Sequence, residues 1–275
     1  MSFSDDGCFL ASVGKRSNVW DVRARKRCGA AKPFSHENHI DIAPDSRRIV
    51  VKNTLGDVAI YDIDLVVEHV SLSGEPYGEG DDVRFSFDAN FIVDSSWRGD
   101  FLVRDSNTGE VVWKSKIPGQ RVTCRRDRMV WCFATDEGLG VQRWPFWDTS
   151  PTVYPYPDDR SGFGSFALAD SGDRVAVATP GAVEVWALEA FTGRAVVAAS
   201  WPTAISGTGD AVAWHPSGTL IAHAGARSAS ILTAELAPIW HEPFPFPSDV
   251  AFSADGCLLA VGDWSKGAVF ALAPS

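Results

Sequence analysis

The sequence predicts an all-β fold built from seven similar units, each a meander of four short antiparallel strands. Three observations lead to this class. A turn between two apolar runs recurs along the whole chain, the runs alternate apolar and polar residues as strands do, and 24 Gly and 16 Pro among 275 residues are too many for long helices. Most of the 11 Trp fall on the predicted strands, where they would pack between stacked sheets.

The recurring turn is the clearest mark of the repeat. Asp and Gly are frequent in it because they tolerate the backbone angles of a tight hairpin turn, so each turn joins two antiparallel strands. Successive turns lie about 40 residues apart, a period typical of propeller blades. The seven turns are Asp6-Gly7, Asp45-Ser46, Asp88-Ala89, Asp127-Arg128, Ser171-Gly172, Ser217-Gly218 and Asp255-Gly256.

The four strands of a unit follow in order around its turn. The first strand ends at an apolar residue just before the turn, such as Phe252, and the second follows the turn, as in Ile49–Val51. The third is a run such as Val183–Trp186, and a weaker fourth run such as Val111–Trp113 closes most units. One meander cannot bury both of its faces, so the units must stack, and radial stacking predicts a seven-bladed β-propeller.

We expect a single domain over residues 1–275, because no linker interrupts the repeat. Only Met1–Phe3 precedes the first turn, and the last unit ends after its third strand, so the strand that closes the ring is expected to be missing or incomplete. Face packing alone, a longer natural N-terminus and a strand from a partner chain each fit this pattern. The expected units are 1–41, 42–83, 84–122, 123–165, 166–211, 212–249 and 250–275.

Three segments resemble the repeat core of the WD40-repeat family. They are Phe3–Ser12 followed by Val19-Trp20-Asp21, Trp214–Ala222, and Phe252–Ala260. Only Trp20-Asp21 is a true Trp-Asp ending and no Gly-His dipeptide occurs, so the chain is similar to a degenerate member. The resemblance implies a protein-interaction scaffold that presents a loop-lined propeller face to a partner peptide or protein.

The charge balance bears on the partners. The net charge is −10, and residues 136–275 hold 6 Lys+Arg against 15 Asp+Glu, which is 6 − 15 = −9. An acidic chain is a poor generic ligand for phosphate backbones, so we expect no nucleic-acid partner. No apolar run approaches the roughly 20 residues that cross a bilayer, and the N-terminus lacks the features of a secretory signal. We therefore expect a cytoplasmic protein without a membrane partner.

The five cysteines include no C-x-x-C pair. Cys8, Cys124, Cys132 and Cys257 lie in or beside apolar stretches, where a free cysteine behaves as a small apolar residue. We expect buried, unpaired thiols in a reducing compartment.

Motifs of catalysis and metal binding are absent from the sequence. It has no G-x-S-x-G and no H-E-x-x-H, and His36 and His39 form a loop pair without a third ligand nearby. The sequence therefore predicts no catalytic residue, no metal, no cofactor and no enzyme.

The loops between second and third strands carry the candidate partner site. In ring order the seventh, first, second and third units are adjacent, and their loops contribute two Trp, five cations and one acid. Because Trp and Arg dominate interface hot spots, this basic arc would suit an acidic segment of a partner protein. Alternatively, both Trp rings fold over neighbouring loops and the cations are ordinary solvated charges. The arc residues are Trp264, Lys266, Lys15, Arg16, Lys52, Trp97 and Arg98.

A second candidate site lies at the channel mouth, where the first strands begin. Its residues are His39, Asp82, Arg121 and Asp249. They support the alternative function, a small-molecule- or carbohydrate-binding or hydrolytic propeller.

Two further basic segments, Arg23–Arg27 and Arg125–Arg128, map to turns on the face opposite the arc. A nucleic-acid site needs interleaved aromatic residues and a consistent basic stripe, which both segments lack. We expect them to be solvated turns.

Overall fold

The structure, a computed structural model, describes residues 1–31, 36–73, 80–96, 99–116, 122–157, 165–203, 210–225, 227–263 and 265–272. Contacts divide the chain into two compact units, Met1–Val122 and Thr123–Ser275, and each is described by itself. The described residues form strands joined by turns, together with one 3-10 turn, η1 (Phe146–Asp148). Within these ranges no helix has the length and apolar content needed to cross a bilayer. The predicted all-β class is confirmed.

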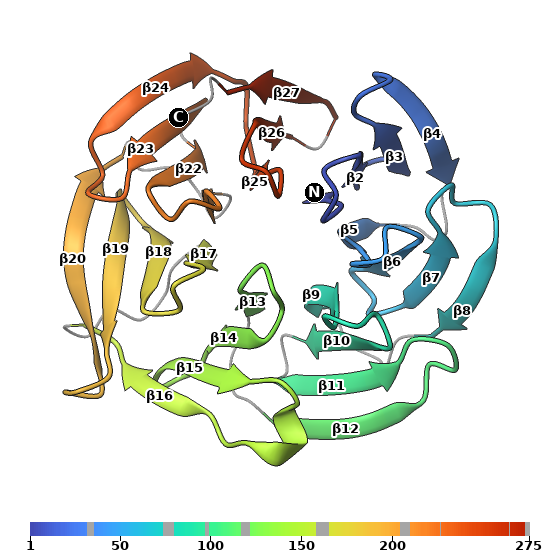
Figure 1. The fold of residues 1–275 in the computed structure, drawn as a ribbon, viewed down its shortest axis with the longest axis horizontal. Coiled ribbons are helices and arrows are strands. Elements are labelled where there is room, and N and C mark those ends of the chain that lie inside the picture. Colours follow the sequence, from blue (N-terminus) through green and yellow to red (C-terminus); the bar gives the residue numbers. More distant parts are fainter. Residues whose placement is uncertain are drawn as a thin grey trace. The chain divides into compact units, whose positions relative to one another are not determined.

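The first unit contains three four-stranded antiparallel sheets, whose strands are hydrogen-bonded in chain order (Figure 1). The first sheet is β1 (Ser2–Phe3), β2 (Phe9–Ser12), β3 (Ser17–Asp21) and β4 (Lys26–Ala31). The second is β5 (Glu37–Ile42), β6 (Arg48–Asn53), β7 (Val58–Asp62) and β8 (Glu68–Leu72). The third is β9 (Gly80–Phe85), β10 (Phe91–Ser96), β11 (Asp100–Asp105) and β12 (Val111–Lys116).

The second unit contains three more four-stranded sheets and one sheet with three described strands. The fourth sheet is β13 (Val122–Cys124), which begins one residue before the unit, β14 (Val130–Ala134), β15 (Gly138–Arg143) and β16 (Thr152–Pro155). The fifth is β17 (Ser165–Leu168), β18 (Arg174–Thr179), β19 (Ala182–Glu189) and β20 (Arg194–Pro202). The sixth is β21 (Ala211–Trp214), β22 (Leu220–Gly225), β23 (Ser228–Thr233) and β24 (Pro238–Pro243). The seventh is β25 (Asp249–Phe252), β26 (Leu258–Gly262) and β27 (Gly267–Ala271).

The predicted repeat matches the sheets in number and strand order, but its limits fall too late. Each predicted limit lies inside the first strand of the following sheet. For example, residue 41 ends the first predicted unit, whereas β5 spans Glu37–Ile42. The reason is that the turn is the visible signal, and the first strand of a sheet precedes its turn. The first strand, β1, has two residues, in keeping with the short segment Met1–Phe3 before the first turn.

Apolar side chains of consecutive sheets pack face to face within each unit. Side chains point alternately to opposite faces along a strand, so one strand serves two interfaces. On β6, Ile49 and Val51 pack toward the first sheet while Val50 packs toward the third. On β18, Val175 packs toward the fourth sheet and Ala176 toward the sixth. This explains why the second strands read as continuous apolar runs rather than as an apolar–polar alternation.

The five cysteines are all free thiols. Cys132 is buried, as predicted, and burial raises the pKa of its thiol well above the usual value. The expectation of burial is wrong for Cys257, which is exposed, and Cys8 and Cys124 are only partly buried. Cys257 follows the turn Asp255-Gly256, where the chain reverses at the surface, although apolar residues come directly after it.

Three of the seven turns share one hydrogen-bond network, in which a serine precedes the turn aspartate by two residues. Ser253 Oγ donates to Asp255 Oδ1 at 2.6 Å, and the same oxygen accepts from the Cys257 backbone N–H at 2.9 Å. Ser4 with Asp6 and Ser86 with Asp88 repeat this arrangement. The following glycine in two of these turns has positive φ (Gly7 +67°, Gly256 +72°), a conformation that other residues adopt only with strain.

These turns predict a loss of stability in acid. The hydrogen bond from Ser253 lowers the pKa of Asp255; burial acts to raise the pKa of Asp6 and Asp88, but serine and backbone donors bring the net value below 3.8. A carboxylate with a depressed folded-state pKa stabilises the fold above its unfolded pKa, and this contribution is lost as pH falls through the folded value.

We therefore expect wild type to be more stable at neutral pH than the triple variant Asp6→Asn, Asp88→Asn, Asp255→Asn. The gap in unfolding free energy should be constant above about pH 5 and should shrink as pH falls below about 4. Urea titrations across this range measure it, and a gap that stayed the same at about pH 3 would contradict the prediction.

Candidate functional site

The described arc residues lie in separate units. In the first unit, Lys15 and Arg16 are exposed between β2 and β3, as predicted. In the second, exposed Lys266 places its Nζ 6.0 Å from the centroid of the Phe244 ring. Trp97, Arg98 and Trp264 lie outside the described residues. The arc therefore stays a prediction.

Lys52 is a correction to the predicted arc, because its side chain is buried and not available to a partner. Its residue is 1 % exposed, and Nζ donates to Asp94 Oδ1 and to the Ser95 carbonyl on β10. The strand β6 continues through Lys52 to Asn53, so the residue belongs to the sheet and not to the loop. Arg104 Nε lies 3.2 Å from Asp94 Oδ2 and completes a buried ionic cluster between the second and third sheets.

Two of the channel-mouth residues come together in the first unit. His39 Nδ1 on β5 lies 3.8 Å from Asp82 Oδ1 on β9, and Arg84 Nε lies 2.7 Å from Asp82 Oδ2. Asp249 begins β25 in the second unit, and Arg121 lies outside the described residues. Of the predicted channel-mouth residues, the structure thus brings together His39 and Asp82, and the Asp82 carboxylate is also bound by Arg84.

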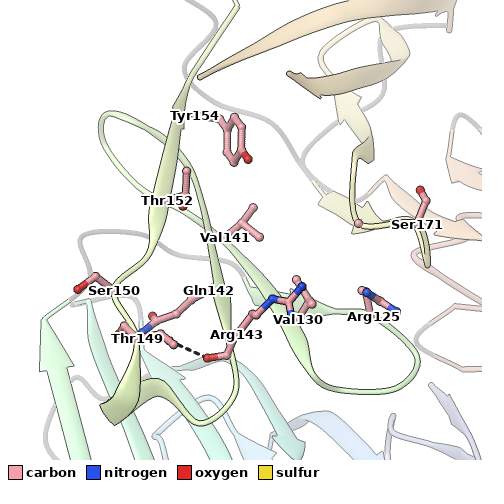
Figure 2. Close-up of a pocket in the computed structure, with 11 residues that line it drawn as sticks. Arg125, Val130, Val141, Gln142, Arg143, Thr149, Ser150, Thr152, Tyr154 and Ser171 are labelled. Carbon is pink, nitrogen blue, oxygen red and sulfur yellow. Dashed lines mark hydrogen bonds between the residues drawn. The ribbon is translucent and has the colours of Figure 1, made fainter. Parts of the chain in front are cut away.

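A cleft of about 320 Å³ lies in the second unit, between the fourth sheet and the β17–β18 turn (Figure 2). This volume is at the small end of ligand pockets, which span roughly 300–1,000 Å³. Its lining is rich in hydrogen-bond donors and holds two arginines and no acid. The lining residues are Arg125, Val130, Val141, Gln142, Arg143, Thr149, Ser150, Thr152, Tyr154, Ser171 and Gly172.

Buried hydrogen bonds fix the loop between β15 and β16 that forms one wall of the cleft. The buried amide Nε2 of Gln142 donates to the carbonyls of Phe146 (3.0 Å) and Thr149 (2.6 Å). Thr149 Oγ1 donates in turn to the Arg143 carbonyl at 2.9 Å, which closes the loop on itself (Figure 2). These bonds fix the backbone of the loop.

An aromatic cluster joins this loop to the turn that carries Arg125. Trp131 Nε1 donates to the Arg128 carbonyl at 2.7 Å, and its ring packs edge-on against Phe146. Trp144 packs on both Phe146 and Trp147. Trp147 stays 44 % exposed beside the cleft loop, so a large aromatic surface faces solvent on an anchored segment.

The two arginines of the cleft keep donors available. Arg125 uses one terminal nitrogen on Asp127 Oδ2 (2.8 Å), while its buried Nε has no partner among the described residues. Arg143 is exposed, and within the described ranges its guanidinium makes no hydrogen bond or ion pair. Figure 2 shows its side chain extending toward the side of the cleft on which Arg125 lies.

Sequence reasoning missed this cleft. It interpreted Arg125–Arg128 as a solvated turn and singled out neither Arg143 nor the hydroxyl residues 149–152. One signal was present: the run Trp144-Pro145-Phe146-Trp147 gathers three aromatic residues between two strands, next to Arg143. In the part of the chain that the structure describes, no group of three His, Cys, Asp or Glu side chains is arranged to hold a metal ion.

Comparisons with known proteins support the fold. No protein-family model matches the chain, and no curated protein matches it by sequence. In contrast, 1655 chains of solved structures are similar to it, so this fold is widespread and assigns no activity by itself. Among them is hydrazine synthase of Kuenenia stuttgartiensis, with a TM-score of 0.78 and 15 % identity over 99 % of this chain and 94 % of that chain. At this identity the likeness shows the fold alone, the seven-bladed β-propeller that the repeat predicts.

Proposed function

We propose that this propeller is a protein-interaction scaffold and that its partner presents an acidic segment to the cleft of the second unit. The observation that carries the proposal is the exposed Trp147 on the anchored loop that follows Arg143, whose guanidinium makes no hydrogen bond or ion pair with a described residue. Trp and Arg are the residues most enriched in interface hot spots. The donors that line the cleft favour a ligand that brings oxygen acceptors.

The anchoring of the loop favours binding energetically. Gln142 and Thr149 already hold the loop, and Trp131 holds the facing turn, so little conformational entropy remains to be lost on association. The sheets act as a rigid frame, and the binding residues stand on the connections between strands. In this proposal the protein has no catalytic role; it displays a fixed surface.

Two finer assignments belong to the same proposal. The residues shared with the WD40 repeat core support membership in that family as a degenerate member. A cytoplasmic location is part of the same proposal. The small-molecule or hydrolytic alternative at the channel mouth is less favoured, because Asp82 is engaged by both His39 and Arg84.

Replacing Trp147 by alanine should weaken partner binding without unfolding the protein. Peptides selected by the wild-type chain from a displayed library should be acidic and should bind Trp147→Ala at least about tenfold more weakly, as expected for a hot-spot residue. The matched control is Phe191→Ala, since Phe191 is a fully exposed aromatic residue at the β19–β20 turn of the same unit.

Two results would overturn the proposal. One is a selection that enriches no peptide, and the other is equal weakening by Trp147→Ala and Phe191→Ala. A parallel experiment with Trp97→Ala and Trp264→Ala tests whether the predicted arc binds the partner. Loss of binding in those variants but not in Trp147→Ala would assign the interface to the arc instead of the cleft.

A further inference from the structure

We infer that the cleft between the fourth sheet and the β17–β18 turn recognises a phosphate monoester on a side chain of the partner, that is, a phosphoserine or phosphothreonine. The inference rests on the proposed function and adds the chemistry of the group that enters the cleft. Two arginines line one small cleft, Arg125 from the β13–β14 turn and Arg143 from the end of β15. Guanidinium groups bind phosphate oxygens through paired, charge-assisted hydrogen bonds.

The donors of the cleft exceed what the protein itself uses. An arginine has five N–H donors, and among the described residues Arg125 uses one terminal nitrogen, on Asp127. Its Nε is buried and unpaired among the described residues, so turning the guanidinium toward an acceptor breaks no bond at that atom. The guanidinium of Arg143 forms no hydrogen bond with a described residue, so its donors are available to a ligand.

Hydroxyl groups add further donors around the arginines. Ser150 and Thr152 line the cleft and form no side-chain hydrogen bond with another described residue. The hydroxyls of Thr149 and Ser171 are already donated, to the Arg143 carbonyl and to Asp173 respectively. A tetrahedral group with three outer oxygens could use two guanidiniums and two hydroxyls at once, whereas a carboxylate has only two oxygens.

The engagement of Arg125 by Asp127 favours a dianion over a single carboxylate as the ligand. Asp127 competes for this guanidinium, so a ligand must attract it more strongly than one carboxylate does. Asp173 and the net charge of −10 repel any anion, so the attraction must come from the two arginines. A phosphate monoester carries about −1.5 to −2 charges at pH 7, roughly twice the charge of a glutamate.

The surroundings favour a single phosphate on a protein rather than a nucleic acid. A nucleic acid needs a basic stripe, but the neighbouring Arg126 is taken by the Asp170 carboxylate and the Ala254 carbonyl. The exposed Trp147 on the cleft loop instead offers an aromatic surface to the rest of a peptide. A phosphorylated side chain in the cleft, with its peptide across Trp147, accounts for both features.

The test titrates the full chain with small probes while NMR follows the arginine Nε–Hε signals. The probes are N-acetyl-phosphothreonine amide, N-acetyl-threonine amide, N-acetyl-glutamate amide and inorganic phosphate. We expect phosphothreonine to shift the signals that Arg125→Gln and Arg143→Gln remove, and to bind more tightly than the other three. Arg143→Gln should weaken it about tenfold, the loss expected for charge-assisted hydrogen bonds. The control Arg194→Gln removes an exposed arginine of β20 and should change nothing.

Each other outcome overturns the inference in a defined way. Equal binding of the glutamate probe makes the cleft a general acidic-segment site, which leaves the scaffold proposal intact. Equal binding of inorganic phosphate makes the site one for the free anion. Tighter binding to phosphatidylcholine vesicles containing phosphatidylinositol phosphate than to phosphothreonine makes it a membrane site. Peptide binding that is insensitive to Trp147→Ala separately defeats the proposal that the scaffold binds its partner at the cleft, whatever the phosphate probes do.

Discussion

Replacing Asp94 by alanine should lower the free energy of unfolding by about 3–5 kcal/mol, the usual cost of removing one partner from a buried ion pair. Asp94 is 5 % exposed and holds both Lys52 Nζ and Arg104 Nε. Without it, the Ser95 carbonyl is the remaining partner of Lys52 among the described residues, for a charge that has almost no contact with water. Because the free energy of unfolding of a domain is only about 5–15 kcal/mol, this single change should remove a large part of it.

A second variant distinguishes the cost of leaving the Lys52 charge unpaired from the cost of lost packing. The double variant Lys52→Met, Asp94→Leu removes both members of the buried Lys52–Asp94 pair, and buried ion pairs replaced by apolar residues are often neutral in stability. Arg104 loses this carboxylate as well, but its side chain is 19 % exposed and keeps contact with water. We expect the double variant to recover most of the loss, as measured by urea denaturation of all three proteins. If Asp94→Ala were within about 0.5 kcal/mol of wild type, the cluster would not stabilise the fold.

Replacing Trp186 by alanine should cost about 3–5 kcal/mol, as for other large buried aromatic residues. The side chain is fully buried in the cluster that joins the fourth and fifth sheets, where it packs edge-on against Tyr156. Its Nε1 also donates to Glu184 Oε2 at 2.8 Å, and Glu184 is itself buried. Truncation therefore opens a cavity and removes a donor from a buried carboxylate.

Two comparisons make this prediction specific. Trp186→Phe keeps most of the ring volume and removes the donor, so its loss should be intermediate. Trp147→Ala, at the exposed tryptophan of the cleft loop, should cost less than about 1 kcal/mol. Chemical denaturation measures all three, and a Trp186→Ala loss no larger than that of Trp147→Ala would contradict the packing described for the cluster.

The sequence predicted the sheets well because their signals are local. A turn such as Asp255-Gly256 and the run Leu258–Ala260 lie within six residues of one another, and hairpin geometry needs only those neighbours. The limits of the sheets were less accurate, since the first strands are set by pairing with strands on the other side of the turn.

The candidate site was harder to predict because it depends on distant residues. Lys52 is polar and follows an apolar run, so it reads as the start of a loop. Its burial depends on Asp94, which lies 42 residues away in the sequence, and on the Ser95 carbonyl. Likewise, Arg143 reaches the cleft because its strand pairs with β14 and because the turn Ser171-Gly172 comes from the next sheet. Hydrophobic periodicity shows which face of a strand is apolar but not which charged residue of another sheet will lie against it.

Each apolar cluster found among the described residues joins two consecutive sheets, and this has a consequence for how the sequence can change in evolution. Each described junction uses its own chemistry: Ile, Val and Tyr61 between the first and second sheets, but Trp186 and Phe166 between the fourth and fifth. A substitution at one junction must be compensated only by the sheet across from it. Sequence drift can therefore proceed junction by junction, which erases a shared repeat motif while every sheet keeps its place in the series.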